Sequence, residues 1–137
     1  MPSENKEYFY LQPKEEAAMK VLWNTEDALS ASEIAQRIEN RSWPASSIQG
    51  ILRNLEKKGA IKVEAITKLG KSYGRLFRPS MSANEYAVMQ FLRYYQPEKS
   101  DCYAMLSSLL GSACIAQEEI IASLQELLEE HQKKEDT

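Results

Sequence analysis

The stretch from Ser42 to Gly59 constrains the fold most, because it places an apolar stripe and a polar, cationic face on the same predicted helix. The apolar positions follow the spacing i, i+3, i+4, i+7 and are Ile48, Ile51, Leu52 and Leu55. This spacing predicts a helix that begins near Pro44 and buries one side. The opposite side carries Ser46, Gln49, Gly50, Arg53 and Lys57. Such a face can reach base edges and phosphates, as a recognition helix requires, although an ordinary surface helix is the alternative that these residues alone leave open.

Positive charge is concentrated around this helix, although the whole chain carries a net charge of −3. Residues 41–80 contain nine Lys and Arg against two Asp and Glu, a net charge of +7. Residues 81–137 contain four against ten, a net charge of −6. A local basic patch matters more for contact with nucleic acid than the total charge does. The charge pattern therefore favours a nucleic-acid-binding surface in the first half of the chain.

Two shorter helices are predicted before the recognition helix. The first begins at Pro13, which suits the first turn of a helix, and ends between residues 24 and 27. Its apolar stripe is Ala18, Met19, Leu22 and Trp23. Ser30 and Glu33 match a capping box, so a second helix follows through about Glu39. With a connection over residues 40–44, the three helices predict a helix-turn-helix.

A basic hairpin is predicted after Gly59, which ends the third helix. Alternation with charged residues predicts a half-buried strand with Ile61, Val63 and Ala65 on its inner side. Residues 67–72 predict a turn whose polar residues include Lys68, Lys71 and Ser72. Residues 73–78 predict the returning strand. Three helices and a hairpin predict a winged helix whose wing lysines contact the sugar-phosphate backbone; solvated loop lysines are the alternative.

Residues 81–137 predict three more helices. Ser82 caps the fourth, with Glu85 three residues on, and Pro97 ends it. The fifth covers residues 101–110, with Gly111 at its end, and the last covers residues 115–133. The apolar stripe of the last helix is Ile120, Ile121, Leu124, Leu127 and Leu128. Because a complete winged helix leaves this stripe little core to cover, it predicts a dimer interface; packing against the fourth helix of the same chain is the alternative.

These elements predict a mainly α protein with a small β wing: a winged-helix DNA-binding domain over residues 1–80 and a helical dimerisation region over residues 81–137. No apolar run is long enough to cross a membrane and no signal peptide is recognisable, so we expect a cytoplasmic protein. Cys102 and Cys114 are expected to be buried small hydrophobes. With a single histidine, no metal-ligand cluster, no phosphate-binding glycine loop and no nucleophile motif, we expect neither an enzyme nor a metal or cofactor.

Three segments resemble the penicillinase-repressor family of bacterial regulators. They are Glu16–Trp23 with its Met-x-x-Leu-Trp pattern, Ser32–Ala35, and the stretch from Trp43 to Gly59. The resemblance covers residues 10–80 well and residues 81–137 in general layout. It implies a homodimeric transcriptional repressor that binds palindromic operators through an N-terminal winged helix and dimerises through C-terminal helices.

The resemblance also assigns positions within the motif. Ser46 and Ser47 stand where the family has a Thr-Thr pair, while Pro44 replaces its usual capping Ser and Gly50 stands where it often has Thr. The copper-responsive branch of the family carries a Cys-x-Cys cluster near its C-terminus, and the β-lactam-responsive branch carries an Asn-Phe bond associated with cleavage. This sequence has neither. The inducing signal therefore stays open.

Two functional hypotheses follow. The first is a sequence-specific DNA-binding repressor, with Ser46, Gln49 and Arg53 reading bases and Arg53 placed for a bidentate guanine contact. The residues assigned to DNA are Ser46, Ser47, Gln49, Gly50, Arg53, Asn54, Lys57, Lys68, Lys71 and Ser72. The second is a winged helix that binds an acidic protein partner and no DNA. Binding to random duplex DNA at low salt discriminates between the two.

Overall fold

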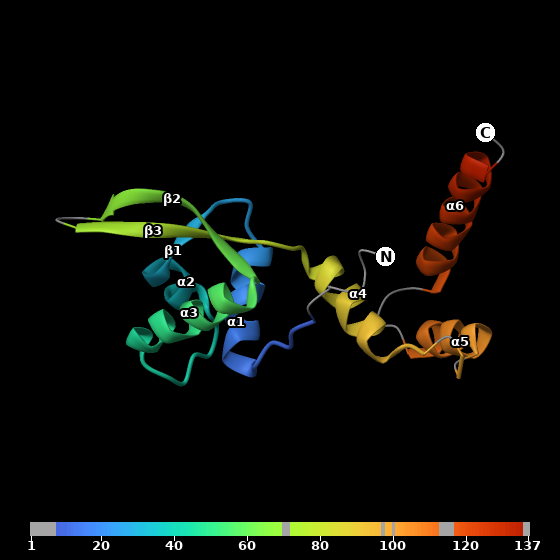
Figure 1. Cartoon of the computed structure of the whole chain (residues 1–137), viewed down its shortest axis with the longest axis horizontal. Coiled ribbons are helices and arrows are strands. Elements are labelled where there is room, and N and C mark those ends of the chain that lie inside the picture. The colour runs from blue at the N-terminus through green and yellow to red at the C-terminus, as the bar shows by residue number, and fades with distance from the viewer. Residues whose placement is uncertain (1–7, 70–71, 97, 100, 113–116, 136–137) are drawn as a thin grey trace. The chain divides into compact units, whose positions relative to one another are not determined.

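The computed structural model describes residues 8–69, 72–96, 98–99, 101–112 and 117–135. Contacts divide the chain into two compact units, Met1–Tyr94 and Tyr95–Thr137. The first unit holds α1 (Pro13–Trp23), β1 (Leu29–Ser30), α2 (Ala31–Arg37), the 3-10 turn η2 (Ala45–Ser47), α3 (Ile48–Lys58), β2 (Ile61–Leu69), β3 (Ser72–Pro79) and α4 (Ala83–Tyr94). The second unit holds α5 (Cys102–Ser112) and α6 (Gln117–Glu135) (Figure 1).

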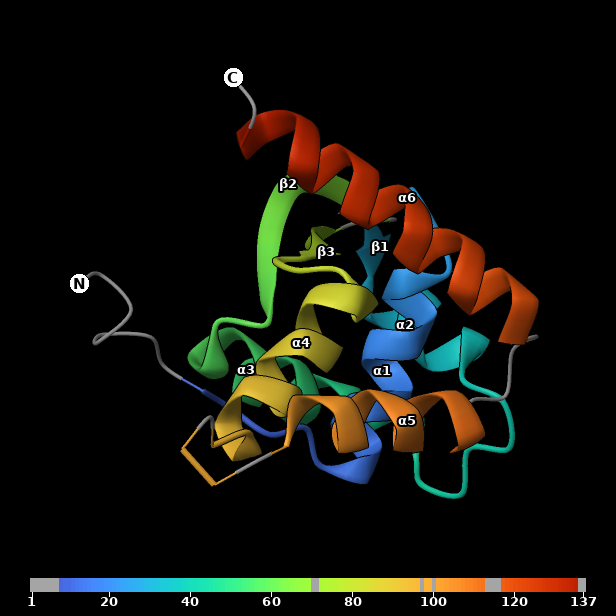
Figure 2. The same cartoon turned by 90° about the vertical axis from the view of Figure 1, so that its right-hand side faces the viewer.

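The first unit is a winged helix. Its three strands form an antiparallel sheet in the order β1-β3-β2, in which the short strand β1 was not evident from the sequence. Strands β2 and β3 continue beyond the helices as a two-stranded hairpin (Figure 1). Helix α4 lies at the opposite end of this unit from the outer ends of the two strands (Figures 1 and 2). The predicted fold class, a mainly α winged helix with a helical C-terminal region, is confirmed.

One apolar core lies between α1, α2, α3 and the base of the sheet. The predicted stripe of the third helix is buried in it, and so are Ala18, Met19 and Leu22 of the stripe predicted for the first helix. The largest fully buried apolar side chains are Leu11, Met19, Leu22, Leu29, Ile34, Leu52, Leu55 and Phe77. Trp23 is only partly buried and packs at the margin of the core. The core therefore fixes α3 by its apolar side and leaves the other side outward.

Local capping sets several helix ends as the sequence predicts. The Ser30 hydroxyl accepts the Glu33 N–H at 3.3 Å, and the Glu33 carboxylate accepts the Ser30 N–H at 3.0 Å. Gly59 ends α3 with a φ of 81°, a conformation that glycine adopts without strain. Helix α2 ends at Arg37 and not at Glu39, because the backbone of Ile38 is extended, with a ψ of 118°.

The hairpin is longer and its turn shorter than predicted. Strand β2 continues to Leu69 and β3 begins at Ser72, so most of the predicted turn is paired strand, with Lys68 opposite Tyr73. Residues 70–71 lie outside the described residues. Of the three positions predicted to face inward, only Ile61 is buried. Val63 and Ala65 are exposed, because a β-bulge lies between them and the hairpin leaves the core there.

Two predictions about the C-terminal helices are wrong. Gly111 lies inside α5, which continues to Ser112, because glycine permits a helix end but does not impose one. Cys102 is exposed at the start of α5, where no residue of the helix is buried. Cys114 and Pro97 lie outside the described residues, as do residues 115–116, where the last helix is predicted to begin. Among the described helices, none combines the length and apolarity that a membrane span requires.

The capping box at Ser30 makes the stability of the fold depend on pH. The pKa of Glu33 lies below its ordinary value of 4.5, chiefly because its carboxylate accepts the Ser30 backbone N–H and, next, because of the Ser30 hydroxyl. A carboxylate whose pKa is lowered on folding stabilises the protein above its unfolded pKa, and this contribution is lost as the pH falls through the folded pKa. We therefore expect Glu33→Gln to lower the free energy of unfolding at neutral pH and to cost progressively less below pH 4.5.

Urea unfolding of both proteins at about pH 7 and about pH 3 measures this difference. Glu39→Gln is the control, since Glu39 is exposed and lies outside the cap. An equal cost of Glu33→Gln at both pH values would contradict the assignment.

Candidate nucleic-acid interface

The outward face of α3 consists of the residues that the sequence assigns to DNA. Its exposed residues are Gln49, Gly50, Arg53, Asn54 and Lys57. Residues three and four apart share one side of a helix, so these positions form one continuous strip opposite the buried stripe. Within the described part of the chain, none of these side chains has a hydrogen bond or an ion pair with another residue. Their polar groups are therefore free to meet a partner.

The predicted recognition helix begins with one 3-10 turn, Ala45–Ser47, and not as a continuous α-helix from Pro44. Pro44 precedes this turn with a φ of −63° and accepts the Ser47 N–H on its carbonyl at 3.0 Å. Ser46 is exposed and Ser47 is half-buried. Although Ser47 occupies the N-cap position of α3, its hydroxyl forms no capping hydrogen bond. Both hydroxyls thus stand at the leading end of the polar strip.

Arg41 stabilises the loop that connects α2 to this 3-10 turn. Its Nε donates to the carbonyl oxygen of Ala35 at 3.2 Å, and its Nη1 donates to the carbonyl oxygen of Trp43. The guanidinium carbon lies 5.5 Å from the centroid of the Trp43 ring. These contacts tie the end of α2 to the residue before Pro44. The sequence offers only an Arg-x-Trp spacing as a signal for this role, and that spacing fits many loops.

The wing and α3 share one surface. A hollow of about 370 Å³ between them receives residues from the start of α2, from α3 and from β3. Its lining is Ala31, Ser32, Gln49, Tyr73, Gly74, Arg75 and Phe77. Gln49, assigned to DNA from the sequence, therefore lies on the same hollow as the returning strand of the wing. The geometry brings the predicted helix face and the predicted hairpin together.

Within the wing, the structure describes some of the assigned residues and not others. Lys68 is exposed on β2, opposite Tyr73 on β3. Tyr73 is 73% exposed and was not assigned to the site, although an aromatic residue beside a lysine-rich turn is a signal that could have been used. Lys71 and the side chain of Ser72 lie outside the described residues, so their assignments stay predictions.

Arg75 connects the wing to α3. Its Nη1 lies 3.1 Å from Oε1 of Glu56 on α3, and its guanidinium carbon lies 5.1 Å from the centroid of the Phe77 ring. Phe77 is buried in the core. The pair thus joins the hairpin to α3 close to the point where the hairpin leaves the core. Sequence reasoning did not identify this role, because the two residues are far apart along the chain.

Ion pairs and hydrogen bonds sort eight of the nine basic residues of 41–80 into two groups, and the ninth, Lys71, lies outside the described residues. The residues engaged within the fold are Arg41, Lys58, Arg75 and Arg78. Among the described residues, those with no acidic or hydrogen-bonding partner are Arg53, Lys57, Lys62 and Lys68. Three of these four were assigned to DNA from the sequence. Unpaired cations on one basic segment supply the positive potential that attracts phosphates.

A family model described as penicillinase repressor matches residues 11–130, a span that includes the whole winged helix, α4, α5 and most of α6. No curated protein matches the chain. The family match agrees with the winged-helix fold and with the exposed polar face of α3. The chain therefore belongs to the penicillinase repressor family, whose members are DNA-binding transcriptional repressors.

Proposed function

We propose that this protein represses transcription as a homodimer that binds a palindromic operator, with α3 in the major groove and the wing on the adjacent backbone. The observation that carries the proposal is the strip of free polar and cationic side chains on α3 beside the wing. A major groove about 12 Å wide admits one α-helix and presents a distinct pattern of donors and acceptors for each base pair. A two-stranded ribbon beside it can contact sugar and phosphate.

The exposed groups divide by reach and chemistry. Ser46, Gln49 and Arg53 occupy the leading and central part of the strip and are proposed to read bases. Arg53 offers paired N–H groups, which suit the two acceptors of guanine. The residues proposed to contact phosphates are Ser47, Asn54, Lys57, Lys68, Lys71 and Ser72. Gly50, between the base-reading side chains, is proposed to let the helix backbone approach the groove.

The second unit supports the homodimer. Helix α6 carries its apolar residues at i, i+1, i+4, i+7 and i+8, the seam of a helix that packs against a partner helix. Ile121, Leu124, Leu127 and Leu128 are exposed, and Ile120 is partly covered. On the neighbouring helix α5, Leu106 and Leu109 are exposed as well. A second copy of the chain is the proposed cover for these side chains, because exposed apolar surface on this scale marks an interaction site.

Two substitutions separate base reading from phosphate binding. We expect Arg53→Ala to weaken operator binding by about 10- to 100-fold and to relax specificity at one position, because a bidentate base contact is lost. Lys68→Ala should weaken binding to all sequences alike and reduce the slope of log K against log salt by about 1, because one phosphate contact is lost. Selection of bound duplexes from a random pool, followed by salt titration, measures both effects.

Lys20→Ala is the matched control, because Lys20 lies on α1 and already pairs with Glu16 at 3.0 Å. A uniform loss across sequences for both Arg53→Ala and Lys68→Ala would contradict the division of roles. Absence of any binding to random duplex at low salt would favour a protein-binding winged helix instead.

Replacing Gly50 by alanine should change protein stability and operator affinity in opposite directions. A Cβ added at Gly50 would meet nothing within 4 Å in the described protein beyond its chain neighbours and the backbone of its own helix. Gly50→Ala should therefore stabilise the protein by about 1 kcal/mol, because alanine favours a helix interior over glycine by that amount. It should also weaken operator binding, because the methyl group projects from the groove-facing strip. Thermal unfolding and operator titration test this pair of effects, and unchanged affinity would show that the backbone does not need close approach.

The dimer is tested on α6. We expect Leu124→Asp to dissociate the protein at micromolar concentration and to weaken binding to the full operator, because it places a charge in the apolar seam. Ala122→Asp introduces the same charge on the opposite side of the helix and should leave the dimer intact. Sedimentation of the three proteins, with and without operator, measures the outcome. A wild-type chain that sediments as a monomer in both states would contradict the proposal.

A further inference from the structure

Residues 8–12, which we call the N-terminal strap, lie along α4 without belonging to a helix or strand. The Leu11 N–H donates to the Tyr86 hydroxyl at 2.9 Å, and Gln90 Nε2 donates to the Phe9 carbonyl oxygen at 2.8 Å. The rings of Phe9 and Tyr86 lie 5.9 Å apart. Two side chains of α4 thus satisfy backbone groups that the strap could not pair by itself. The strap is fixed to α4 by hydrogen bonds on two of its residues.

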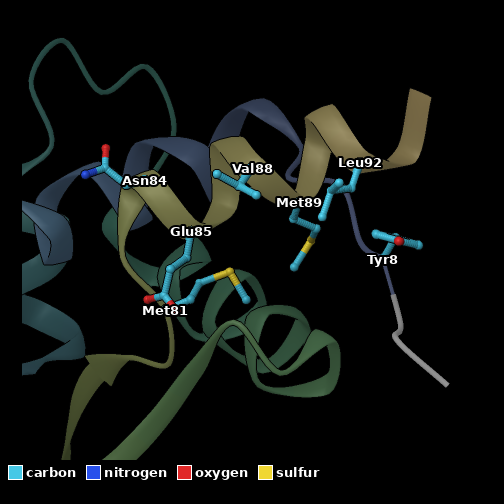
Figure 3. A pocket seen from close by; sticks show the side chains of 7 residues that line it. All are labelled: Tyr8, Met81, Asn84, Glu85, Val88, Met89 and Leu92. Carbon is cyan, nitrogen blue, oxygen red and sulfur yellow. The ribbon is translucent and has the colours of Figure 1, made fainter. Parts of the chain in front are cut away.

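The start of the strap follows the same helix. Tyr8 lines a hollow of about 460 Å³ together with Met81 and with Leu92 on α4. Figure 3 shows Tyr8 beside the end of α4 that carries Leu92, with Met89 nearby on the same helix. The strap therefore runs past α4 from the region of Leu92 to Tyr86.

The other side of the strap is attached to the recognition helix. Lys58, the last residue of α3, donates from Nζ to the Tyr10 carbonyl oxygen at 2.7 Å. The same ammonium pairs with Glu15 at 2.5 Å, and Glu15 is only 4% exposed. The Glu15 carboxylate also accepts the Gln12 N–H at 2.8 Å. A carboxylate with so little solvent holds its cation firmly, so these contacts tie the end of α3 to the strap and to the start of α1.

Three successive residues therefore connect two helices. The Phe9 carbonyl and the Leu11 N–H bond to α4, while the Tyr10 carbonyl between them bonds to α3. Trp23 provides a separate contact between α1 and this region, through its indole N–H on the Met81 carbonyl oxygen at 2.8 Å. The strap differs from that contact because it reaches the recognition helix directly.

We propose that Tyr86, Gln90 and Lys58 are positioning residues that fix the recognition helix α3 relative to α4 through the N-terminal strap. The inference rests on the proposed function, because α4 leads along the chain into the unit proposed to form the dimer. In a two-fold dimer, the placement of α3 relative to that unit sets the spacing between half-sites. A strap that holds α3 and α4 together makes the protein selective for one spacing.

The strap is cut at α4 by the double variant Tyr86→Phe/Gln90→Met, which removes the two hydrogen bonds to the strap and keeps the ring of residue 86 against Phe9. It also removes the bond of 3.4 Å from Arg93 Nη1 to Gln90 Oε1, a contact within α4 that Tyr86→Phe alone leaves in place. The control is Tyr94→Phe/Gln96→Met, which makes the same chemical changes at exposed positions. Loss of hydrogen-exchange protection at the Leu11 amide in the first variant, and not in the control, verifies the cut without any DNA.

The probes are the duplex that the wild-type protein selects from a random pool, the same duplex with one or two base pairs inserted between its half-sites, and a duplex with one half-site. For the cut variant we expect binding to the selected duplex to fall about tenfold, the size of one or two hydrogen bonds. The penalty for inserted base pairs should shrink, and binding to one half-site should change by less than about twofold. A merely structural role would weaken full-site and half-site binding equally and leave the spacing preference intact.

The α3 end of the strap is cut separately by Glu15→Gln/Lys58→Met, which removes the ion pair without leaving a buried charge unpaired. Because the two attachments act in series, combining both cuts should flatten the spacing preference no further than either cut alone. A spacing profile of the cut variant equal to that of wild type overturns the inference while leaving the proposed function standing. A wild-type protein with no spacing preference contradicts both this inference and the proposed function. Should the double variant at α4 fail to fold, Tyr86→Phe alone removes a single oxygen atom and carries the same test.

Discussion

The packing of one side of α3 against α1 and α2 determines where every candidate DNA-binding group on that helix stands. Burial of Ile48, Ile51, Leu52 and Leu55 contributes about 1.5–3 kcal/mol for each side chain. The sum, about 6–12 kcal/mol, is comparable with the whole net stability of a typical domain, about 5–15 kcal/mol. Turning the helix by one residue, about 100°, would expose part of this stripe and bring polar groups inward. The outward strip is thus a direct consequence of core packing.

Electrostatics then fix the last turns of α3 from two sides. Glu56 pairs with Arg75 of the wing, and Lys58 pairs with Glu15 at the start of α1. An exposed pair such as Arg75–Glu56 contributes about 0–1 kcal/mol, too little to matter for overall stability. Its value lies in orientation, since it joins the hairpin to the helix on the surface they share. The cations left over, Arg53 and Lys57 among them, are the ones that the fold does not neutralise.

Features that depend on neighbours in sequence could be predicted, and features that depend on distant contacts could not. The α3 stripe, the Ser30–Glu33 cap and the left-handed Gly59 follow from local spacing and residue type. The bulge after Val63 lies where β2 leaves the core, so that Ala65 and Ile66 beyond it are exposed, and nothing in the local alternation announces it. The bond from Leu11 to Tyr86 joins residues 75 positions apart, which no single-sequence pattern encodes.

The same limit applies to the candidate site. Gln49 and Arg53 were assigned correctly to an exposed face, because helical period alone decides that question. Arg75 reads in sequence as one more basic residue of the wing, and only the fold reveals its pairing with Glu56. The strand order also makes β2 an edge strand of the sheet, and this strand exposes Val63 and Ile66. An open, partly apolar edge is a template for intermolecular strand pairing. Two features oppose such pairing at this edge: the charges of Lys62 and Glu64, and the adjacent bulge. They protect the wing against aggregation through its open strand.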